Sequence, residues 1–411
     1  MSLAPGPVQQ PDRARRIAVV TVARSDYSIY RPVLTALEQD PAVELILIAS
    51  GMHLSPEFGH TVDAIIADGF DVSERVEMTL STDTPTGVAK SIGLGVIGFS
   101  EVFSRQRPDI VVVLGDRYEM LAAASAALPH MLPLAHLHGG EATEGLIDEA
   151  IRHSITKMSH IHFVSTDVYR RRVEQLGEEP WRVVLSGAPG LDNLRTVEIL
   201  SPDELARQHS LDLDSPVLLV TFHPVTLQYE RTAFHVQELL AALEACDEHV
   251  VFTYPNADTH GRVIIDAIRD FVACNPRAQC AVNLGTQGYC SLLRHAKAMI
   301  GNSSSGIIEA ATYELPVVNI GDRQRGRVHG RNVIVSKEDR ESILQSIRKA
   351  VDPQFRDGLN GMKNPYGDGH AAEAIVARLK SVELNEALLL KRFRDLPIEA
   401  QNNSISLAGT K

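Results

Sequence analysis

Short runs of β-branched and aliphatic residues alternate with longer helical patterns along most of this 411-residue chain, and no other feature constrains its fold as much. Strands separated by helices of roughly ten or more residues predict βαβ crossovers and parallel sheets. The sequence therefore predicts an α/β protein with two Rossmann-like, doubly wound parallel-sheet domains that face a central cleft. The expected strands are residues 17–22, 43–49, 110–114, 134–137, 161–164, 183–185, 217–222, 249–253, 279–283, 298–300 and 317–320.

The alternation breaks near residues 201–215, where the polar segments SPDEL and DLDSP interrupt it. A chain of this length also suits two cores better than one. The predicted organisation is a disordered leader at 1–15, a first domain at 16–200, a second domain at 201–368, a C-terminal helix at 369–396 that crosses back to the first domain, and a disordered tail at 397–411.

The charge and hydropathy of the chain limit the partners that we expect. A net charge of -12 argues against nucleic acid and against an acidic membrane surface. No apolar run approaches the roughly 18 residues of a membrane span, and the N-terminal segment lacks the apolar stretch of a signal peptide. We therefore expect a cytoplasmic protein that binds a small phosphorylated ligand and forms a homodimer or homotetramer, the commonest closed assemblies.

A G-x-G-x-x-G pattern at residues 93–98 matches the letters of the dinucleotide-binding fingerprint. That fingerprint must directly follow a strand and open a helix. Here the glycines lie inside a helical pattern that runs from about Val88 to Phe103. We interpret them as sites of close helix packing, so no NAD is expected.

A strand that leads through small residues into a helix is typical of phosphate sites, and residues 299–309 show this pattern. Small side chains let phosphate oxygens approach the backbone, and free N–H groups at a helix N-terminus favour an anion. Glu309 is expected about one turn into the helix, where it could hold ribose hydroxyls. A serine N-cap without any ligand is the alternative.

Four arginines follow the next predicted strand, although the protein is acidic overall: Arg323, Arg325, Arg327 and Arg331. A solvated basic loop would explain them on local evidence. Beside the serine-rich loop, a diphosphate clamp is the better interpretation.

Polar residues also follow other predicted strands and are expected to face the cleft. Arg24, in the segment ARSDY, could meet a phosphate or lie on the surface. His223, in FHP, and Asn256, in YPNAD, end two strands of the second half. A buried core histidine is the alternative for His223.

Acids and histidines concentrate in the middle of the first half. Asp116 follows one predicted strand, His138 and Glu141 follow the next, and Asp148 lies on a helix beyond them. The carboxyl ends of parallel strands share one edge of a sheet, so these groups converge as general acid–base chemistry requires. A helix N-cap is the alternative for Asp116, and an i,i+4 pair with Arg152 is the alternative for Asp148.

Together these motifs resemble the hydrolysing UDP-N-acetylglucosamine 2-epimerases of sialic-acid and legionaminic-acid biosynthesis. The resemblance runs from Arg16 to Asp368 and rests on the order of ARSDY, LGDRYE, HLHGGE, IDEAIRHSITK, FHP, PNAD, IGNSSSGIIE and NIGDRQRGRVHG. It implies the glycosyltransferase-B fold, in which UDP lies against the second domain and the sugar faces the first.

The resemblance also implies a two-step reaction without a metal or any other cofactor. UDP leaves C1 of UDP-GlcNAc while the C2 proton is removed, which gives 2-acetamidoglucal. Water then adds with inversion at C2 and releases N-acetylmannosamine. Three alternatives are the same reaction on UDP-2,4-diacetamido-2,4,6-trideoxyglucose, a glycosyltransferase that needs an acceptor, and a catalytically silent nucleotide-sugar sensor.

Individual roles carry over from the motifs as expectations. At the position of His138, the animal and the non-hydrolysing enzymes carry a glutamate, so either His138 or Glu141 would take over its role. The implied catalytic residues are Asp116, His138, Glu141, Asp148 and His223. The implied substrate contacts are Arg24, Asp26, Arg117, Gly139, Gly140, Asn256, Gly301, Ser303, Ser304, Ser305, Glu309 and Arg323.

Overall fold

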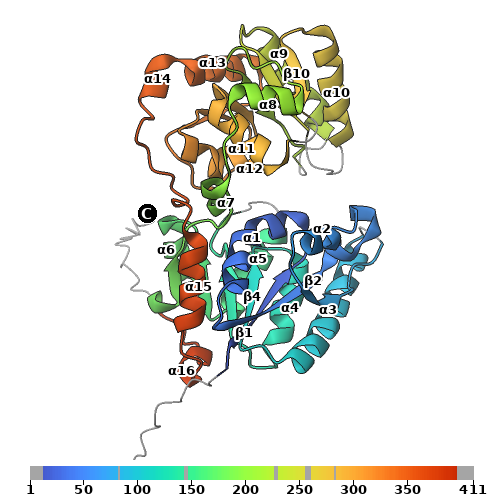
Figure 1. The fold of residues 1–411 in the computed structure, drawn as a ribbon, viewed down its shortest axis with the longest axis vertical. Helices are drawn as coiled ribbons and strands as arrows, with labels where there is room; N and C mark the ends of the chain where they lie inside the picture. The colour runs from blue at the N-terminus through green and yellow to red at the C-terminus, as the bar shows by residue number, and fades with distance from the viewer. Residues whose placement is uncertain are drawn as a thin grey trace, which may run out of the picture.

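The computed structural model contains two parallel sheets, one of seven strands and one of six. Every paired strand in both sheets runs parallel to its neighbour. Figure 1 shows the two sheet domains one above the other, and the predicted class of two Rossmann-like α/β domains is confirmed. The structure describes residues 13–81, 84–142, 147–225, 230–254, 261–281 and 284–395.

The first sheet has the strand order β3-β2-β1-β4-β5-β6-β7. Its strands are β1 (Arg15–Thr21), β2 (Val43–Ser50), β3 (Val72–Val76), β4 (Ile110–Leu114), β5 (Leu134–Leu137), β6 (Ile161–Val164) and β7 (Val183–Leu185). The central strand β4, IVVVL, is buried at every position, as expected for a parallel strand covered on both faces. The order reverses between β1 and β4, and a crevice outside the carboxyl ends of strands forms at such a switch point.

The second sheet repeats this arrangement with the order β10-β9-β8-β11-β12-β13. Its strands are β8 (Leu218–Thr221), β9 (Val250–Thr253), β10 (Ala278–Ala281), β11 (Ala298–Gly301), β12 (Val317–Ile320) and β13 (Val333–Ser336). Its switch point lies between β8 and β11, so the residues that follow these two strands are placed for ligand binding.

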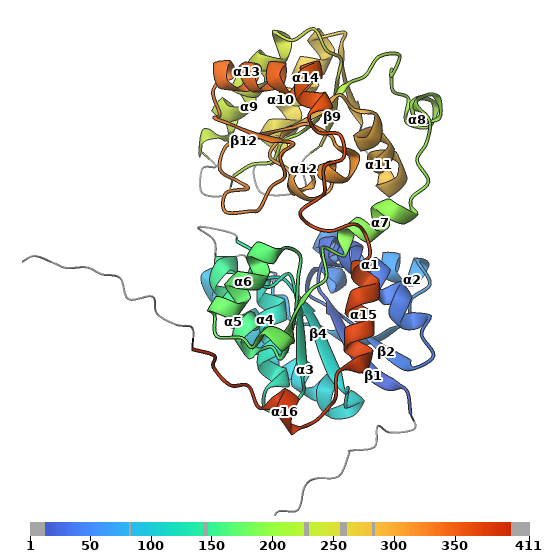
Figure 2. The ribbon, with the colours of Figure 1, turned by 90° about the vertical axis from the view of Figure 1, so that its left-hand side faces the viewer.

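Helices join the strands and cover both sheets. Among the described residues, no helix is long and apolar enough to cross a membrane. In Figures 1 and 2, α7 and α12 lie on the sides of the two domains that face each other. The helices are α1 (Arg24–Glu38), α2 (Val62–Ala67), α3 (Pro85–Gln106), α4 (Tyr118–Ala127), α5 (Ile147–Met158), α6 (Asp167–Gln175), α7 (Gly190–Thr196), α8 (Pro202–His209), α9 (Thr232–Glu244), α10 (Gly261–Cys274), α11 (Gly285–His295), α12 (Ser304–Ile308), α13 (Arg340–Val351), α14 (Pro353–Asp357), α15 (Ala371–Ser381) and α16 (Glu386–Leu389).

The last helices pack on the first domain. Figure 2 shows α15 beside α1, and Ile375 and Leu379 of α15 are fully buried in the core of the first sheet. Arg15 ties this segment to the sheet, since it donates to the carbonyls of Leu379 and Val382 at 2.6 and 2.9 Å. Arg15 also begins β1, so it belongs to the sheet and not to the leader predicted at 1–15.

The glycines of the G-x-G-x-x-G pattern lie inside the long helix α3, as predicted. A Cβ on Gly95 would lie 2.7 Å from the Cε of Met78 and 2.9 Å from the Cβ of Ala122. A Cβ on Gly98 would lie 2.7 Å from Val76. Two of these glycines therefore let α3 approach its neighbours closely, which confirms a packing role for them.

Candidate active site

Asp116 follows β4 at the switch point of the first sheet and pairs with Arg152 of α5. Arg152 is only 4% exposed. Burial and the nearby charge of Arg327 lower the pKa of Arg152 to about 10. Helix α4 begins at Tyr118 with Arg117 as its N-cap, so Asp116 is not a cap and its carboxylate instead holds a buried cation.

Arg117 lies among three carboxyl groups at the same edge. Its guanidinium is 3.3 Å from Glu119 Oε1, and its charge acts to lower the pKa of both Asp26 and Asp148. Burial outweighs that charge and raises the pKa of both acids, that of Asp26 to about 6. Each aspartate therefore retains a proton to higher pH than an exposed aspartate would.

The segment after β5 holds a histidine and a glutamate in direct contact. Nδ1 of His138 lies 2.6 Å from Oε1 of Glu141, and the Ser165 hydroxyl donates to the same oxygen at 2.8 Å. Burial acts to raise the pKa of Glu141, but His138, Arg327 and Ser165 together lower it to about 2. Glu141 is therefore an anion at neutral pH and cannot serve as a proton donor there. His138 Nε2 is buried and has no hydrogen-bond partner among the described residues.

The two glycines between them allow this tight arrangement. Gly140 has a φ of +76°, and a Cβ there would lie 2.7 Å from the carbonyl oxygen of Tyr169. A Cβ on Gly139 would lie 3.1 Å from Nδ1 of His136. Both glycines therefore serve close packing of the loop, and His138 itself has a left-handed φ of 61°.

Gly301 ends β11 and begins the serine-rich loop of the second domain. Its φ is +138°, and a Cβ there would lie 1.9 Å from the carbonyl oxygen of Thr221, so only glycine fits. Ser303 caps α12 by accepting from the Ser305 N–H at 3.4 Å, as the serine-cap alternative predicts. Ser304 begins α12 and is partly exposed.

Helix α12 is shorter than the sequence suggested, because it ends at Ile308 after five residues. Glu309 is its C-cap and does not lie one turn inside a longer helix. The Ser305 hydroxyl donates to Glu309 and accepts from the Tyr289 hydroxyl at 2.8 Å. Burial raises the pKa of Glu309, which suits a carboxyl group that exchanges hydrogen bonds with hydroxyls.

His223 follows β8 at the switch point of the second sheet, beside the serine-rich loop. The Asn302 side chain accepts from the His223 N–H at 2.7 Å and donates to the His223 carbonyl at 2.9 Å. Arg323 donates to the Asn302 carbonyl at 3.1 Å. Burial and the charge of Arg323 lower the pKa of His223 to about 4, so its imidazole is neutral at neutral pH.

The four arginines after β12 do not form one clamp. Arg323 lies at the serine-rich loop, whereas Arg331 donates to the carbonyls of Leu359 and Asn360 at 3.3 and 3.2 Å. Arg325 is exposed, and the charge of Arg327 acts on residues of the first domain. The predicted four-arginine clamp is therefore wrong, because the loop directs these side chains to different places.

Two of the remaining predicted substrate contacts lie near the domain boundary. Arg24 begins α1 after β1 and is exposed, as both of its alternatives allow. Asn256 lies outside the described residues.

The structure adds residues that the sequence did not single out. His53, fully buried, lies 2.9 Å from the Thr21 hydroxyl and 2.7 Å from the Thr61 hydroxyl. Burial and the charge of Arg117 lower its pKa to about 4. Glu119, equally buried, carries the charge that balances Arg117. Its place in LGDRYE was the available signal, since it lies two residues after Arg117.

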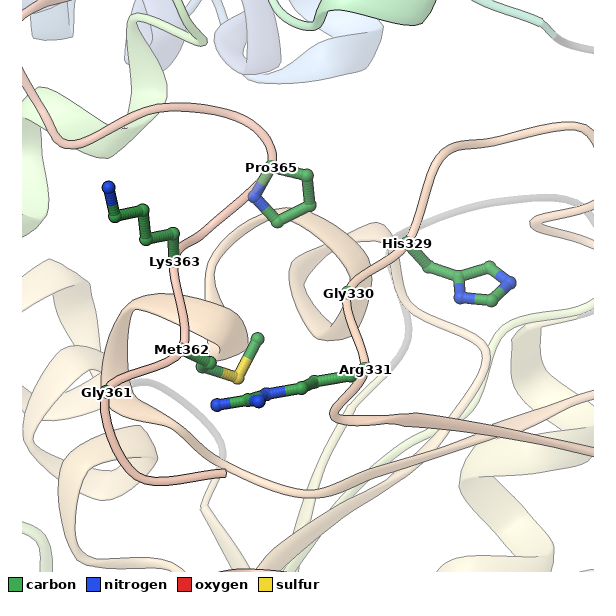
Figure 3. A pocket seen from close by; sticks show the side chains of 7 residues that line it. All are labelled: His329, Gly330, Arg331, Gly361, Met362, Lys363 and Pro365. Atoms are coloured by element: carbon green, nitrogen blue, oxygen red, sulfur yellow. The ribbon is translucent and has the colours of Figure 1, made fainter. Parts of the chain in front are cut away.

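In the part of the chain that the structure describes, no group of three or more histidines, cysteines, aspartates and glutamates is arranged to hold a metal ion. A cavity of about 360 Å³ lies away from the acids, beside the loop that follows β12. Figure 3 shows that the side chains of His329 and Lys363 point in opposite directions there. The cavity is lined by His329, Gly330, Arg331, Gly361, Met362, Lys363 and Pro365.

Two parallel sheets with polar loops at both switch points define a two-domain α/β enzyme of the glycosyltransferase-B type. The family model described as UDP-N-acetylglucosamine 2-epimerase matches residues 35–380, and the chain belongs to that family. The family predicted from the sequence motifs is therefore confirmed.

Two relatives match nearly full length. The GDP/UDP-N,N'-diacetylbacillosamine 2-epimerase (hydrolyzing) of Campylobacter jejuni is 39% identical over 93% of this chain and 99% of its own. The UDP-N,N'-diacetylbacillosamine 2-epimerase (hydrolyzing) of Legionella pneumophila is 36% identical over 92% and 98%. The structure of a UDP-GlcNAc 2-epimerase from Neisseria meningitidis bound to UDP-GlcNAc has a TM-score of 0.75 at 16% identity, covering 89% of this chain and 99% of that one. This last likeness establishes the fold.

Proposed function

We propose that this enzyme converts a UDP-linked 2-acetamido sugar and water into UDP and the free 2-epimer. The C1–O bond to UDP and the C2–H bond break to give a 1,2-unsaturated sugar. Water then supplies a hydroxyl to C1 and a proton to C2, on the face that inverts C2. The observation that carries the proposal is the convergence of Asp116 and the His138–Glu141 pair at one switch edge, beside Asp148.

The second domain is proposed to hold UDP. Donors that approach a diphosphate in a water-poor cleft stabilise the charge that develops as it leaves. The serine-rich loop offers backbone N–H groups and hydroxyls, and Arg323 is held beside it by Asn302. A helix of five residues adds little dipole, so side chains and loop backbone carry this proposal. We assign UDP contacts to Gly301, Ser303, Ser304, Ser305, Glu309, Arg323 and Asn256.

The first domain is proposed to carry out proton transfer. Asp116, held as an anion by Arg152, is suited to accept a proton, and Asp148, with its raised pKa, is suited to hold one. His138 is proposed as the proton-transfer group of its loop and Glu141 as the group that orients it, because ionised Glu141 binds Nδ1 and leaves Nε2 for the substrate. His223 is proposed to meet the sugar diphosphate as a neutral donor.

The remaining substrate contacts are proposed at the boundary of domains 16–200 and 201–368, with the helical segment 369–396 returning to the first. Arg24, Asp26, Arg117, Gly139 and Gly140 all follow strands at the switch edge of the first sheet.

The first candidate substrate is UDP-2,4-diacetamido-2,4,6-trideoxyglucose, which is UDP-N,N'-diacetylbacillosamine. Relatives whose names state this activity are 39% and 36% identical across nearly the whole chain. The second candidate is UDP-GlcNAc, which the sequence motifs favoured first and which the matching family description names. Both candidates share the C1 and C2 chemistry and differ at C4 and C6.

Side-by-side kinetics with the two sugars would decide between them. We expect purified enzyme to release UDP from the diacetamido sugar with a kcat/KM at least roughly tenfold higher, the discrimination that a few pocket contacts supply. A higher kcat/KM for UDP-GlcNAc would make it the substrate instead. Release of UDP from neither sugar would overturn the proposed function.

A further inference from the structure

The loop after β12 reaches the first domain at Val328, where two tyrosines hold its backbone. The Val328 N–H donates to the Tyr169 hydroxyl at 3.0 Å, and the Val328 carbonyl accepts from the Tyr366 hydroxyl at 2.8 Å. Because Tyr366 uses its single hydroxyl proton on Val328, the 3.1 Å contact between the two hydroxyls is a bond that Tyr169 donates. Both tyrosines are fully buried. These three residues are called the clamp.

The clamp shares a helix with the acid–base loop. Tyr169 lies on α6, and its carbonyl is the atom that a Cβ on Gly140 would approach to 2.7 Å. Arg172, one turn further along α6, donates to the Gly140 carbonyl at 2.6 Å. Helix α6 therefore supports the loop that carries His138 on one side and the clamp on the other.

Arg327 directly precedes the clamped residue and reaches towards the same loop. Its charge helps to lower the pKa of the buried Glu141 carboxyl group, and it also acts on Arg152. A buried carboxylate that binds an imidazole needs a nearby positive charge, because burial alone favours its neutral form. Arg327 supplies this charge from the other domain.

We propose that Arg327 is a positioning residue for the His138–Glu141 pair, delivered across the domain boundary by Tyr169 and Tyr366. The inference deepens the proposed function and rests on it for the role of that pair in proton transfer. Arg327 keeps Glu141 ionised and aimed at His138, while UDP is bound by other residues. Catalysis thus depends on the two domains being joined at Val328.

Turnover of the diacetamido sugar and UDP binding, measured by calorimetry, test the inference in the full-length enzyme. Arg327→Ala should lower kcat roughly 30-fold or more, as expected when a buried charge loses its partner. The Kd for UDP should stay within about threefold, because the proposed UDP contacts remain. Arg327→Lys should recover part of the loss. Arg340→Ala, which removes an exposed positive charge from the start of α13, is the matched control and should match the wild type.

A double-mutant cycle separates positioning from a merely structural role. Tyr169→Phe should lower kcat in the wild-type background and cause no further loss in the Arg327→Ala background. An equal loss in both backgrounds, or an Arg327→Ala enzyme with unchanged kcat, would overturn the inference. Should the wild type hydrolyse neither sugar, hydrogen–deuterium exchange of residues 138–141 still decides. Faster exchange in Arg327→Ala than in Arg340→Ala supports the inference, and equal exchange refutes it.

Discussion

The imidazole of His138 and the carboxylate of Glu141 lie 2.6 Å apart, just beyond the end of β5. Glu141 is buried and its pKa is lowered to about 2, so the pair consists of a fixed anion and a titratable ring. A carboxylate that binds one ring nitrogen sets which nitrogen exchanges a proton with the substrate. This relationship assigns different roles to two residues that the sequence could not separate.

His138→Ala should therefore remove most turnover, by roughly 100-fold or more, since it deletes a proton-transfer group. Glu141→Gln should cost less, and the double variant should be no slower than His138→Ala alone, because Glu141 acts through His138. Steady-state kcat values for the four enzymes test this. A double variant much slower than His138→Ala would show that Glu141 has a catalytic role of its own.

Asp116→Asn should abolish proton transfer at the switch edge and lower kcat roughly 100-fold or more. UDP binding should largely survive, since the proposed UDP contacts lie in the other domain. Calorimetry with UDP and rate measurements on the same preparation check both statements. Asp167→Asn, which removes an exposed carboxylate paired with Arg170, should be silent. Substantial turnover by Asp116→Asn would remove Asp116 from the mechanism.

Gly301→Ala should destabilise the second domain and weaken UDP binding together. Its Cβ would lie 1.9 Å from the Thr221 carbonyl, and a φ of +138° is strained for any other residue. We expect a loss of about 3 kcal/mol or more in the free energy of unfolding, which chemical denaturation measures. The matched control is Gly93→Ala, where a Cβ meets nothing in the interior of α3, and stability should rise by about 0.5–1 kcal/mol. Equal stability of the two variants would contradict the close approach of Gly301 to Thr221.

Glu178→Gln should make stability less dependent on pH. Glu178 is fully buried and pairs with Lys157, His162 and Lys391. Burial acts to raise its pKa, but these partners lower it from 4.5 to about 2. A lowered folded-state pKa stabilises the fold above pH 4.5 and loses this effect as the pH falls towards 2.

At pH 7 the Glu178→Gln variant should therefore be less stable than the wild type by about 2–3 kcal/mol. The difference should shrink steadily between pH 5 and pH 2 in denaturant titrations. A difference that is independent of pH would mean that the carboxylate charge is not what stabilises this cluster.

The strands that could be predicted are those whose burial leaves a simple pattern. The apolar runs of β1, β4 and β11 were located to within two residues, because both faces of a central parallel strand are covered. The edge strands β3, VSERV, and β13, VIVS, were missed. Each has only one or two buried positions, so its sequence carries little periodic signal.

The site was predictable to the extent that strand ends determine it. Asp116, His138 and the serine-rich loop could be placed at sheet edges, because polar residues directly follow apolar runs. The direction of Arg327 could not be predicted, since it depends on hydrogen bonds between Val328 and two distant tyrosines. Contacts between residues far apart along the chain leave no local pattern in a single sequence.

The most direct test of the central claim is proton NMR of the products that the enzyme forms in deuterated water. The account predicts free UDP and a free sugar with inverted configuration and deuterium at C2, because the original C2 proton is removed before water adds. A product that keeps UDP attached, or a free sugar that retains its C2 proton, would contradict hydrolysis with epimerisation by this site.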